Sequence, residues 1–263
     1  MHYKNVLVLR SNENNIRWKE ILNNVFDEIK VVVVFDNSKS LPNYPELDLV
    51  LFNNTNVDKL GLMSCDDMTW RFGDYVFYLV SYHLKNKNIT FDYIWLVEPD
   101  VFLKKNIIDI ISSFNDNPAA FLTTYFSDAN DSWNWSKYTK DLGLIKPYKT
   151  FFPFVRVNRK LVEFLYDKRL KTNTLANDEV FVASFLGSSD FSVGLFSELL
   201  KYNRNSFSYG IPHFIPFIKY YPFTKHDIFH PAFDFLNDYT CNIVKKKAYK
   251  NILKRLLLIN NDD

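Results

Sequence analysis

Two carboxylates one residue apart interrupt an otherwise apolar segment of the sequence. Positions 93–97 are all apolar or aromatic, and Glu98, Pro99 and Asp100 follow directly. Ligands of parallel α/β sheets bind beyond the carboxyl ends of the strands, which is where these acids are expected to lie. Paired carboxylate oxygens suit an Mg²⁺ or Mn²⁺ ion that holds a diphosphate. The alternative is a strand-end turn with solvated acids, since short acidic triplets are common.

A second acidic pair begins a predicted helix over residues 177–186, where Asn177 is followed by Asp178 and Glu179. Either carboxylate would serve as a general base that takes the proton of an attacking hydroxyl. The positive end of the helix dipole favours the anionic form at this position. Capping of the helix by Asn177 explains the same residues without catalysis. A base here implies inversion at the reacting carbon, and the sequence leaves inversion and retention open.

Arg71 and Asp74 are three residues apart on a helix predicted over residues 68–85, so we expect them to face the same side. They would either reach a ligand together or form a surface ion pair of little energetic value.

Three histidines, His213, His226 and His230, lie in a segment over 202–236 that is rich in proline and aromatic residues. His230 is the candidate metal ligand, and structural packing beside proline is the alternative. A zinc site is a further possibility, but the sequence contains neither H-x-x-x-H nor H-E-x-x-H spacing.

Aromatic residues are frequent between positions 125 and 138. Flat rings stack on sugar faces, so these side chains would suit an acceptor subsite, and core packing is the alternative. The residues concerned are Tyr125, Trp133, Trp135 and Tyr138.

The elements that must position these residues alternate between strands and helices. Continuous apolar strands separated by helices indicate a mostly parallel sheet that is covered on both faces. We expect an irregular insertion at 127–150 and loops with short strands at 202–236. Strands are predicted at 6–9, 31–35, 47–52, 91–97, 119–125, 151–157 and 191–196, and helices at 12–29, 68–85, 106–114, 159–170, 177–186 and 243–259.

Composition excludes several classes of protein. The 263 residues are 47% hydrophobic and 24% charged, which is typical of a soluble globular protein. A net charge of +2 argues against a nucleic-acid-binding protein. Only 6 glycines are present, and their positions form no G-x-G-x-x-G fingerprint, P-loop or nucleophile elbow. Two distant cysteines and the lack of a signal-type or membrane-spanning segment favour a cytoplasmic protein.

The last predicted helix, over residues 243–259, carries six cations and no acid. Its apolar residues follow helical spacing, and such a basic amphipathic helix suits an anionic membrane surface. A helix docked on the domain with a solvated basic face is the alternative.

Taken in order, these motifs resemble those of GT-A-type glycosyltransferases, with Glu98–Asp100 as an E-x-D variant of the D-x-D motif. The resemblance implies one Rossmann-like GT-A domain over residues 1–241, followed by a basic helix at 242–263. Residues 1–125 would form the nucleotide-sugar-binding half and 126–241 the acceptor half. This chain departs from the pattern because its first acid is Glu and Pro99 separates the acids, so Asp100 ranks above Glu98 as a metal ligand.

The resemblance also implies roles for individual residues. Asp178 or Glu179 would be the catalytic base, and Asp100, His230 and Glu98 would bind Mn²⁺ or Mg²⁺. The ion would stabilise the charge on a departing nucleoside diphosphate. The residues expected to bind the donor are Arg10, Asp36, Arg71, Asp74 and Glu98.

The function implied is sugar transfer from a nucleotide-diphosphate donor to a glycan or lipid-linked glycan of a bacterial capsule, O-antigen or lipooligosaccharide. No nucleic-acid partner is expected, and the protein would act in the cytoplasm or at the inner face of the membrane. Two rivals are a sugar-phosphate nucleotidyltransferase and a non-catalytic glycan-binding protein. The first usually needs a glycine-rich phosphate loop near the N-terminus, which residues 9–13 do not provide.

Overall fold

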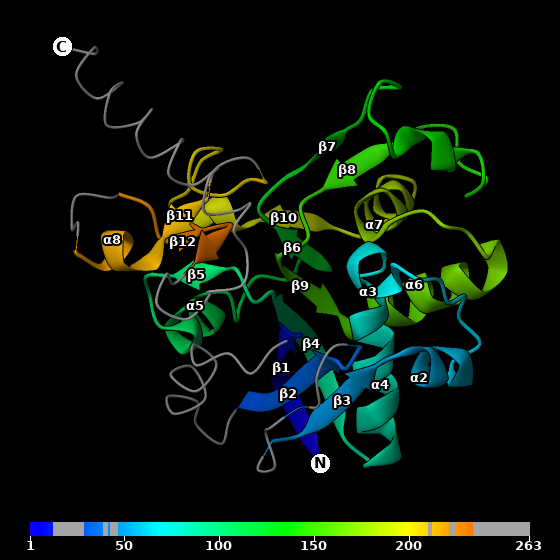
Figure 1. The fold of residues 1–263 in the computed structure, drawn as a ribbon, viewed down its shortest axis with the longest axis horizontal. Coiled ribbons are helices and arrows are strands. Elements are labelled where there is room, and N and C mark those ends of the chain that lie inside the picture. Colours follow the sequence, from blue (N-terminus) through cyan, green and yellow to red (C-terminus); the bar gives the residue numbers. More distant parts are fainter. Residues whose placement is uncertain (13–28, 39–41, 43–46, 210–211, 221–224, 234–263) are drawn as a thin grey trace. The chain divides into compact units, whose positions relative to one another are not determined.

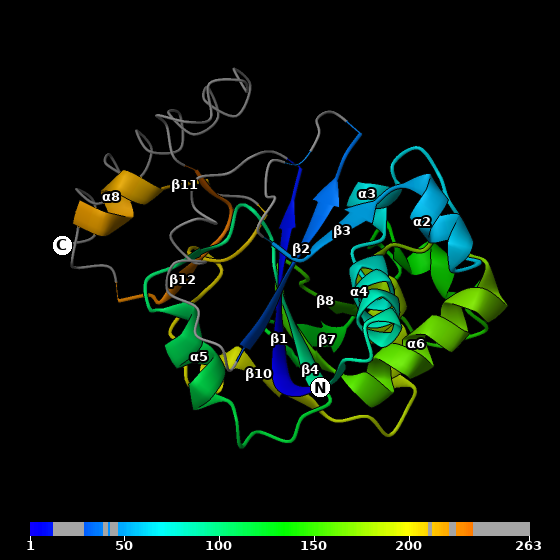
Figure 2. The same ribbon diagram turned by 90° about the horizontal axis from the view of Figure 1, so that it is seen from below.

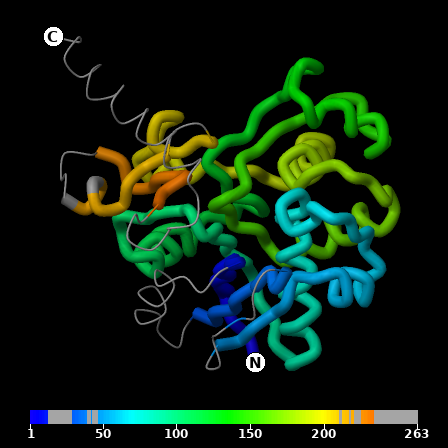
Figure 3. Tube along the Cα trace, in the orientation of Figure 1, coloured from blue at the N-terminus to red at the C-terminus, as the bar shows by residue number. Residues whose placement is uncertain are grey.

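A computed structural model describes residues 1–12, 29–38, 42, 47–209, 212–220 and 225–233 of the chain (Figures 1 and 3). The predicted helix at 243–259, with the proposed membrane-binding surface, and all of the predicted helix at 12–29 except its two end residues lie outside the described residues; Ile29 begins a strand. The chain divides into two compact units. The first comprises residues 1–99 and 111–196, and the second comprises 100–110 and 197–263. The boundaries predicted from the sequence at residues 125 and 241 stay predictions.

The first unit is built on a seven-stranded sheet with the order β10-β6-β9-β4-β1-β2-β3. All neighbouring strands are parallel except β9, which runs antiparallel to both β4 and β6. The predicted mixed α/β fold with a mostly parallel central sheet is therefore confirmed. The strands are β1 (His2–Ser11), β2 (Ile29–Asp36), β3 (Leu49–Phe52), β4 (Thr90–Val97), β6 (Phe121–Thr123), β9 (Phe154–Asn158) and β10 (Val193–Leu195).

The two faces of this sheet have separate cores. On one face, α4 and α6 lie side by side and pack with alternate residues of the strands, such as Val6, Val8 and Val32 (Figure 2). On the other face, Trp95 of β4 packs against a cluster of phenylalanine rings. The helices named so far and their neighbours are α2 (Asn54–Lys59), α3 (Met68–Arg71), α4 (Tyr75–Asn86), α5 (Ile107–Ser113), α6 (Arg159–Thr172) and α7 (Asp178–Gly187).

Helix α7 is buried along nearly its whole length. Every residue from Asp178 to Leu186 is buried, in agreement with a sequence that is apolar on all sides after its first two acids. Burial of the two acids is unusual for residues of this type, which are almost never enclosed without partners. Their environment is therefore the first place to look for chemistry.

The predicted single helix over 68–85 is wrong. The chain forms α3, then breaks at Phe72 and Gly73, and resumes as α4 at Tyr75. The apolar spacing continues across the break, so periodicity alone cannot reveal it. As a consequence Arg71 and Asp74 do not lie on one helical face.

The insertion predicted to be irregular contains a short antiparallel ribbon. Strand β7 (Phe126–Asp128) pairs with β8 (Tyr148–Thr150), and the rings of Phe126 and Tyr148 stack at 5.7 Å. A 3₁₀ turn, η1 (Ser136–Thr139), lies between the two strands. This ribbon extends the edge of the first unit next to α7.

The second unit has short elements, as expected for 202–236, and a helix that the sequence did not indicate. A small core of Ile215, Ile218, Phe229 and Ala232 holds it together. No helix in the described part of the chain is both long and apolar enough to cross a membrane. The elements are β5 (Phe102–Leu103), η2 (Phe196–Glu198), β11 (His213–Phe214), α8 (Ile215–Tyr220), β12 (Ile228–Phe229) and β13 (Ala232–Phe233).

Candidate functional site

Arg10 and Glu98 meet at the carboxyl edge of the first unit's sheet. Strands β1 and β4 are parallel neighbours, and their register pairs Leu9 with Val97, so the next residue of each strand stands at the same level. Arg10 Nη1 donates to Glu98 Oε1 at 2.5 Å, and both side chains are largely enclosed. The Glu98 N–H donates to the carbonyl of Pro153, which fixes the backbone at this turn.

Asp36 ends β2 at the same edge of the sheet, beside Phe52 of β3. It is half-buried, and its Oδ1 accepts a hydrogen bond from the Ser38 N–H at 3.0 Å. The structure thus places Arg10 and Asp36 among the last residues of β1 and β2, and Glu98 directly after the neighbouring β4, at the strand ends where ligands of parallel sheets bind.

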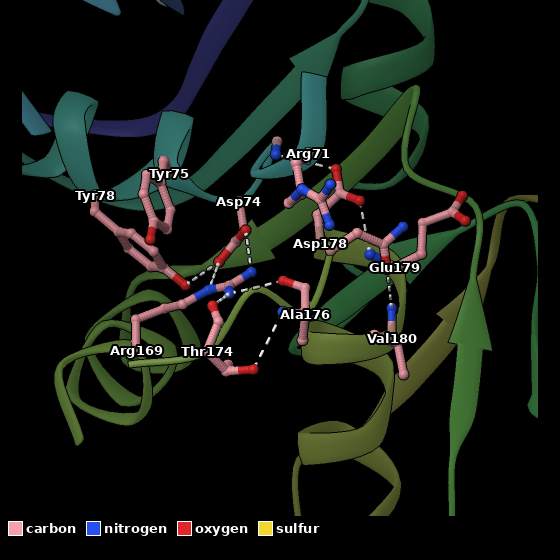
Figure 4. A network of polar contacts seen from close by, with 12 residues as sticks. Arg71, Asp74, Tyr75, Tyr78, Arg169, Thr174, Ala176, Asp178, Glu179 and Val180 are labelled. Atoms are coloured by element: carbon pink, nitrogen blue, oxygen red, sulfur yellow. Dashed lines mark hydrogen bonds and ion pairs between the residues drawn. The ribbon is translucent and has the colours of Figure 1, made fainter. Parts of the chain in front are cut away.

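The carboxylate of Asp178 is held by two backbone N–H groups (Figure 4). Gly73 donates to its Oδ2 at 3.1 Å, and Glu179 donates to its Oδ1 at 2.7 Å. Asn177 caps the helix as predicted, because its side chain accepts from the Val180 N–H. Asn177 therefore caps the helix, while the carboxylate of Asp178 has other partners and is not needed for capping.

Glycine is the only residue type that this contact permits at position 73. A Cβ atom at position 73 would lie 2.2 Å from Asp178 Oδ2 and 3.2 Å from the ring of Phe152. No side chain can occupy that space unless the carboxylate moves. The close approach of the Gly73 backbone thus explains a glycine between two helices.

The pKa of Asp178 lies well above the usual range of an aspartate. Burial is the largest cause, and the negative charges of Glu179, Asp74 and Glu98 raise the pKa further, whereas Arg10 lowers it. These effects outweigh the two N–H donors, which favour the anion. Asp178 consequently holds a proton at higher pH than an exposed carboxylate, and this is the property that a general base near neutral pH requires.

Arg71 and Asp74, predicted to act together, have separate partners. Arg71 binds Asp67 through Nε and Nη2, at 3.0 and 2.6 Å. Asp74 is fully enclosed, and both of its oxygens accept from Arg169 at 2.8 Å. We therefore no longer assign Asp74 to substrate binding, because its side chain is 0% exposed and its charge is neutralised by the Arg169 guanidinium. Arg71 remains a candidate at the surface.

In the second unit, Asp100 and His230 are brought together. Asp100 Oδ2 lies 3.2 Å from His230 Nε2. The antiparallel pairing of Phe102 with Phe229 aligns the two segments, and the Ala232 N–H donates to the Asp100 carbonyl at 2.7 Å. His213 and His226 instead have their rings against Phe229.

The tautomer of His230 bears on metal binding. Its Nδ1 lies 3.1 Å from the carbonyl oxygen of Ser208, and a carbonyl only accepts, so we assign the proton to Nδ1. The neutral ring then presents the lone pair of Nε2 toward the carboxylate of Asp100. A hydrogen bond between Nε2 and the Asp100 carboxyl requires a proton on one of the two groups, and a cation bound by both is the alternative. Metal-binding histidines commonly hold their second N–H on a backbone carbonyl as His230 does.

The side chains that could bind a metal here suit an open site and not a closed one. Among the described residues, no three His, Cys, Asp or Glu side chains are grouped so that they could hold an ion. Asp100 and His230 alone could supply only two protein ligands, so an ion held there would need phosphates and water at its remaining positions, as Mg²⁺ commonly does. They do not form a closed zinc site. Glu98 is bound by Arg10, which favours a role in donor binding over direct metal binding.

An aromatic cluster lies on the surface close to α3. Trp70 is 68% exposed, and its ring centroid is 6.1 Å from that of Trp135, which in turn stacks on Tyr138. The guanidinium of Arg71 lies 5.3 Å above Trp135. Trp133, Trp135 and Tyr138 all pack against the main core on their inner side.

Tyr125 takes a different part in the structure. Its hydroxyl bonds with Ser127 Oγ at 2.6 Å, and the Lys149 ammonium lies 5.7 Å from its ring centroid. Tyr125 is therefore held beside the ribbon of β7 and β8.

Three residues of this region were not assigned roles from the sequence. In the sequence, Trp70 looks like one position of an amphipathic helix, and Arg169 looks like a surface cation on α6. Gly73 is the third, because the requirement for glycine at this position becomes visible only from its contact with Asp178. Gly73 had a local signal, since a glycine inside a helical pattern marks a break or a close contact. Arg169 had none, because its partner Asp74 is 95 residues away.

Comparisons with known proteins give only distant structural similarities. No family model and no curated protein matches the chain. The mannosyltransferase PcManGT from Pyrobaculum calidifontis, in complex with GDP-Man and Mn²⁺, is 14% identical with a TM-score of 0.40, over 73% of this chain and 54% of that chain. The chain thus spans about half the length of that protein.

Two further structures are similar at a comparable level. The 4-diphosphocytidyl-2C-methyl-D-erythritol synthase from Anaerococcus prevotii is 11% identical, with a TM-score of 0.37, over 73% of this chain and 86% of that chain. A197 from STIV is 10% identical, with a TM-score of 0.28, over 61% and 67% of the two chains. Because these similarities are distant, function has to be inferred from the residues of the site itself.

Proposed function

We propose that this chain is a metal-dependent glycosyltransferase that moves a sugar from a nucleoside-diphosphate donor to a hydroxyl of a glycan. The observation that supports this proposal most is the environment of Asp178. Its carboxylate is held by the Gly73 N–H, and burial together with the neighbouring acids raises its pKa. Such a group is suited to accept a proton from a hydroxyl during transfer.

The reaction is written as a displacement at the anomeric carbon of the donor sugar. The acceptor oxygen forms a bond to this carbon while the bond from the carbon to the phosphate oxygen breaks. The hydroxyl proton passes to Asp178, and the nucleoside diphosphate leaves with the electron pair of the broken bond. Burial, and after it the charge of Glu179, keeps the pKa of Asp178 high. This geometry of attack inverts the configuration of the anomeric carbon.

The donor is assigned to the carboxyl edge of the first unit's sheet. Arg10 supplies a fixed guanidinium for a phosphate oxygen, since Glu98 holds it in place. Asp36, at the end of the adjacent β2, would accept hydrogen bonds from ribose hydroxyls. Arg71 is the further cation that we assign to the donor.

Asp100 and His230 are the residues that would hold Mn²⁺ or Mg²⁺. When bound, such an ion supplies positive charge that stabilises a departing diphosphate. The protein's own contribution is to align the two ligands, through the β5–β12 pairing, and to fix the tautomer of His230 through the Ser208 carbonyl.

The acceptor is proposed to be a glycan or lipid-linked glycan, as the resemblance noted in the sequence implies. The exposed ring of Trp70 and the half-buried ring of Trp135 offer an aromatic surface on which a sugar ring would stack. This surface is three residues along the chain from Gly73, which contacts Asp178. Synthesis of a bacterial surface polysaccharide is the setting that we propose for the reaction.

Two measurements test this function. Titration calorimetry with a panel of nucleotide sugars, with and without Mn²⁺, should detect binding of at least one donor that strengthens with the metal. Donor hydrolysis or sugar transfer should then require Asp178, and release of nucleoside diphosphate measures both. An exposed acid such as Glu163, changed to Gln, provides the control.

The outcomes separate the proposal from its rivals. Release of pyrophosphate from a nucleoside triphosphate and a sugar phosphate would identify a nucleotidyltransferase instead. Glycan binding without any donor binding would identify a non-catalytic glycan-binding protein. Absence of nucleotide binding in either condition contradicts the proposal.

A further inference from the structure

A fully buried ion pair lies next to Asp178 and has no part in the proton transfer proposed above (Figure 4). Arg169 of α6 donates through Nε and Nη2 to the two oxygens of Asp74, both at 2.8 Å. The two side chains are 1% and 0% exposed. The hydroxyl of Tyr78 adds a third hydrogen bond to Asp74, at 2.8 Å. Every charged atom of the pair is thereby enclosed and bonded.

The third nitrogen of Arg169 reaches the segment that leads into α7. Nη1 donates to the Ala176 carbonyl at 2.9 Å and lies 3.5 Å from the Thr174 carbonyl. The ring of Phe181, one turn into α7, lies 3.6 Å from the guanidinium carbon. Arg169 therefore ties α6 both to the start of α4 and to the start of α7.

These two attachments lie on either side of Asp178. Asp74 follows Gly73, whose N–H donates to the Asp178 carboxylate, and Ala176 stands two residues before Asp178. A displacement of either segment would lengthen the Gly73–Asp178 hydrogen bond. Replacement of buried ion pairs by apolar residues is often neutral or stabilising, so stability alone gives little reason to keep this one.

We propose that Arg169 and Asp74 form a positioning pair that holds the Gly73 N–H against the carboxylate of Asp178. The proposal rests on the proposed function only in that Asp178 is the proton acceptor there. The pair acts through Gly73 and Ala176, and neither of its members touches a substrate. Loss of the pair should leave the donor site in place and misplace the base.

The hydrogen bond itself offers a readout that needs no substrate. The chemical shift of an amide proton bound to a carboxylate changes when the carboxylate is protonated, so the Gly73 amide reports the state of Asp178. The charged groups that act on Asp178 are Glu179 on its own helix, Asp74, Glu98 and Arg10. Among these, only Asp74 belongs to the pair.

The sequence makes this amide easy to isolate. Gly73 is the only glycine of the six that follows a phenylalanine. Protein labelled with ¹³C-carbonyl phenylalanine and ¹⁵N-glycine therefore gives one signal in a carbonyl-filtered amide spectrum. The position of this signal is followed from pH 4 to pH 9 in the full chain, and Asp178→Asn shows which part of the change comes from Asp178.

Two variants remove the pair in different ways. Arg169→Lys keeps the charge but cannot bond to Asp74 and Ala176 at once, because it lacks the planar fork of arginine. The set Arg169→Met, Asp74→Leu and Tyr78→Phe makes the site apolar and leaves no buried charge. Asp48→Asn is the matched control, since it disturbs another enclosed ionic cluster in the same unit.

We expect the wild-type protein and Asp48→Asn to show the full pH-dependent shift of the Gly73 signal. In either variant of the pair the shift should fall to less than half, and kcat should fall about a hundredfold with the KM for the donor unchanged. Retention of the full shift in a folded variant would overturn the proposal. The proposal would also be overturned if the Gly73 signal shifted with pH in Asp178→Asn as it does in the wild-type protein.

The two proposals can fail separately. If the amide results hold but no nucleotide sugar is turned over, the positioning pair stands and the proposed function does not. If Asp178→Asn abolishes transfer while the pair can be removed without effect on the amide, the function stands and the positioning role does not.

Discussion

Asp48 and Asp178 are two enclosed carboxylates of the same unit, and their environments are opposite. Asp48 precedes β3 at the amino-terminal edge of the sheet, where it is surrounded by Lys30, His83 and Lys87. Burial alone would raise its pKa, but hydrogen bonds from these partners hold the pKa far below the usual range. Asp178 has three acids and one arginine around it, and its pKa is raised.

The difference separates a buried charge that stabilises the fold from one whose environment suits the proton acceptor that we propose. Asp48 is compensated by cations, so its anion is stabilised and it binds no proton near neutral pH. Asp178 is left in an environment that disfavours its anion, which costs stability. Such uncompensated groups cluster at functional sites, because a proton acceptor must be able to change its charge. The following predictions test this contrast, from the largest expected effect to the smallest.

Asp178→Asn should have the largest effect on activity. The amide retains the shape of the side chain but cannot accept the proton, so we expect kcat for sugar transfer to fall about a thousandfold. Donor affinity, measured by calorimetry, should stay within about twofold of the wild type. Asp48→Asn should transfer sugar at the wild-type rate, and equal losses in both variants would contradict the contrast.

Gly73→Ala should be the next most damaging change. Its Cβ would meet Asp178 Oδ2 at 2.2 Å, so the carboxylate must move, and we expect a loss of about a hundredfold in kcat. Gly143→Ala is the control, since its Cβ would meet nothing within 4 Å and its cost is confined to a backbone φ of +68°. Steady-state kinetics of the two variants separate displacement of the base from a general glycine effect.

Trp70→Ala should act on the acceptor alone. The ring is largely exposed, so its removal should hardly change the melting temperature. A lost stacking contact of roughly 0.5–1.5 kcal/mol corresponds to a rise of about two- to tenfold in the KM for the acceptor. An unchanged acceptor KM would remove Trp70 from the proposed subsite, and the donor KM serves as the internal control.

The two aspartates should affect stability in opposite directions. The folded-state pKa of Asp178 is raised, so its anion destabilises the fold as pH rises above the unfolded-state value, and Asp178→Asn should raise the free energy of unfolding at pH 7. The folded-state pKa of Asp48 is lowered, so its contribution is present at pH 7 and is lost as the pH falls below about 4. Asp48→Asn should therefore lower the free energy of unfolding at pH 7, by about 2 kcal/mol.

Urea unfolding of both variants at pH 4 and pH 7 measures these changes. The difference between wild type and each variant should shrink at the lower pH in both cases, because the wild-type carboxylate and its neutral replacement become more alike. A stabilised Asp48→Asn protein or a destabilised Asp178→Asn protein at pH 7 would contradict the assignment of the two environments.

The sequence predicted the parts of the fold that depend on local pattern. The apolar runs at 6–9, 31–35 and 91–97 are strands, and Asn177 caps a helix, because each of these signals is complete within a few residues. The break at Phe72 and Gly73 was missed, since the helical spacing of apolar residues continues through it. Its cause is a contact with Asp178, 105 residues away.

The site was predictable as a set of residue types and not as a set of partners. Glu98, Asp178 and Asp100 could be selected from their positions after strands or at a helix start. Their partners come from other elements: Glu98 binds Arg10 through the register of β1 and β4, and Asp100 meets His230 through β5 and β12. The partner of Asp74 could not be predicted for the same reason, since nothing in the sequence of α6 indicates that Arg169 is buried against it.

The pH dependence of sugar transfer tests the central claim most directly. If Asp178 accepts the proton, kcat must rise with pH through a midpoint above the ordinary aspartate value of 3.8, and this acid limb must be absent in Asp178→Asn. The control variant Asp48→Asn should show the same midpoint as the wild-type protein. An acid limb that persists unchanged in Asp178→Asn would show that another group accepts the proton.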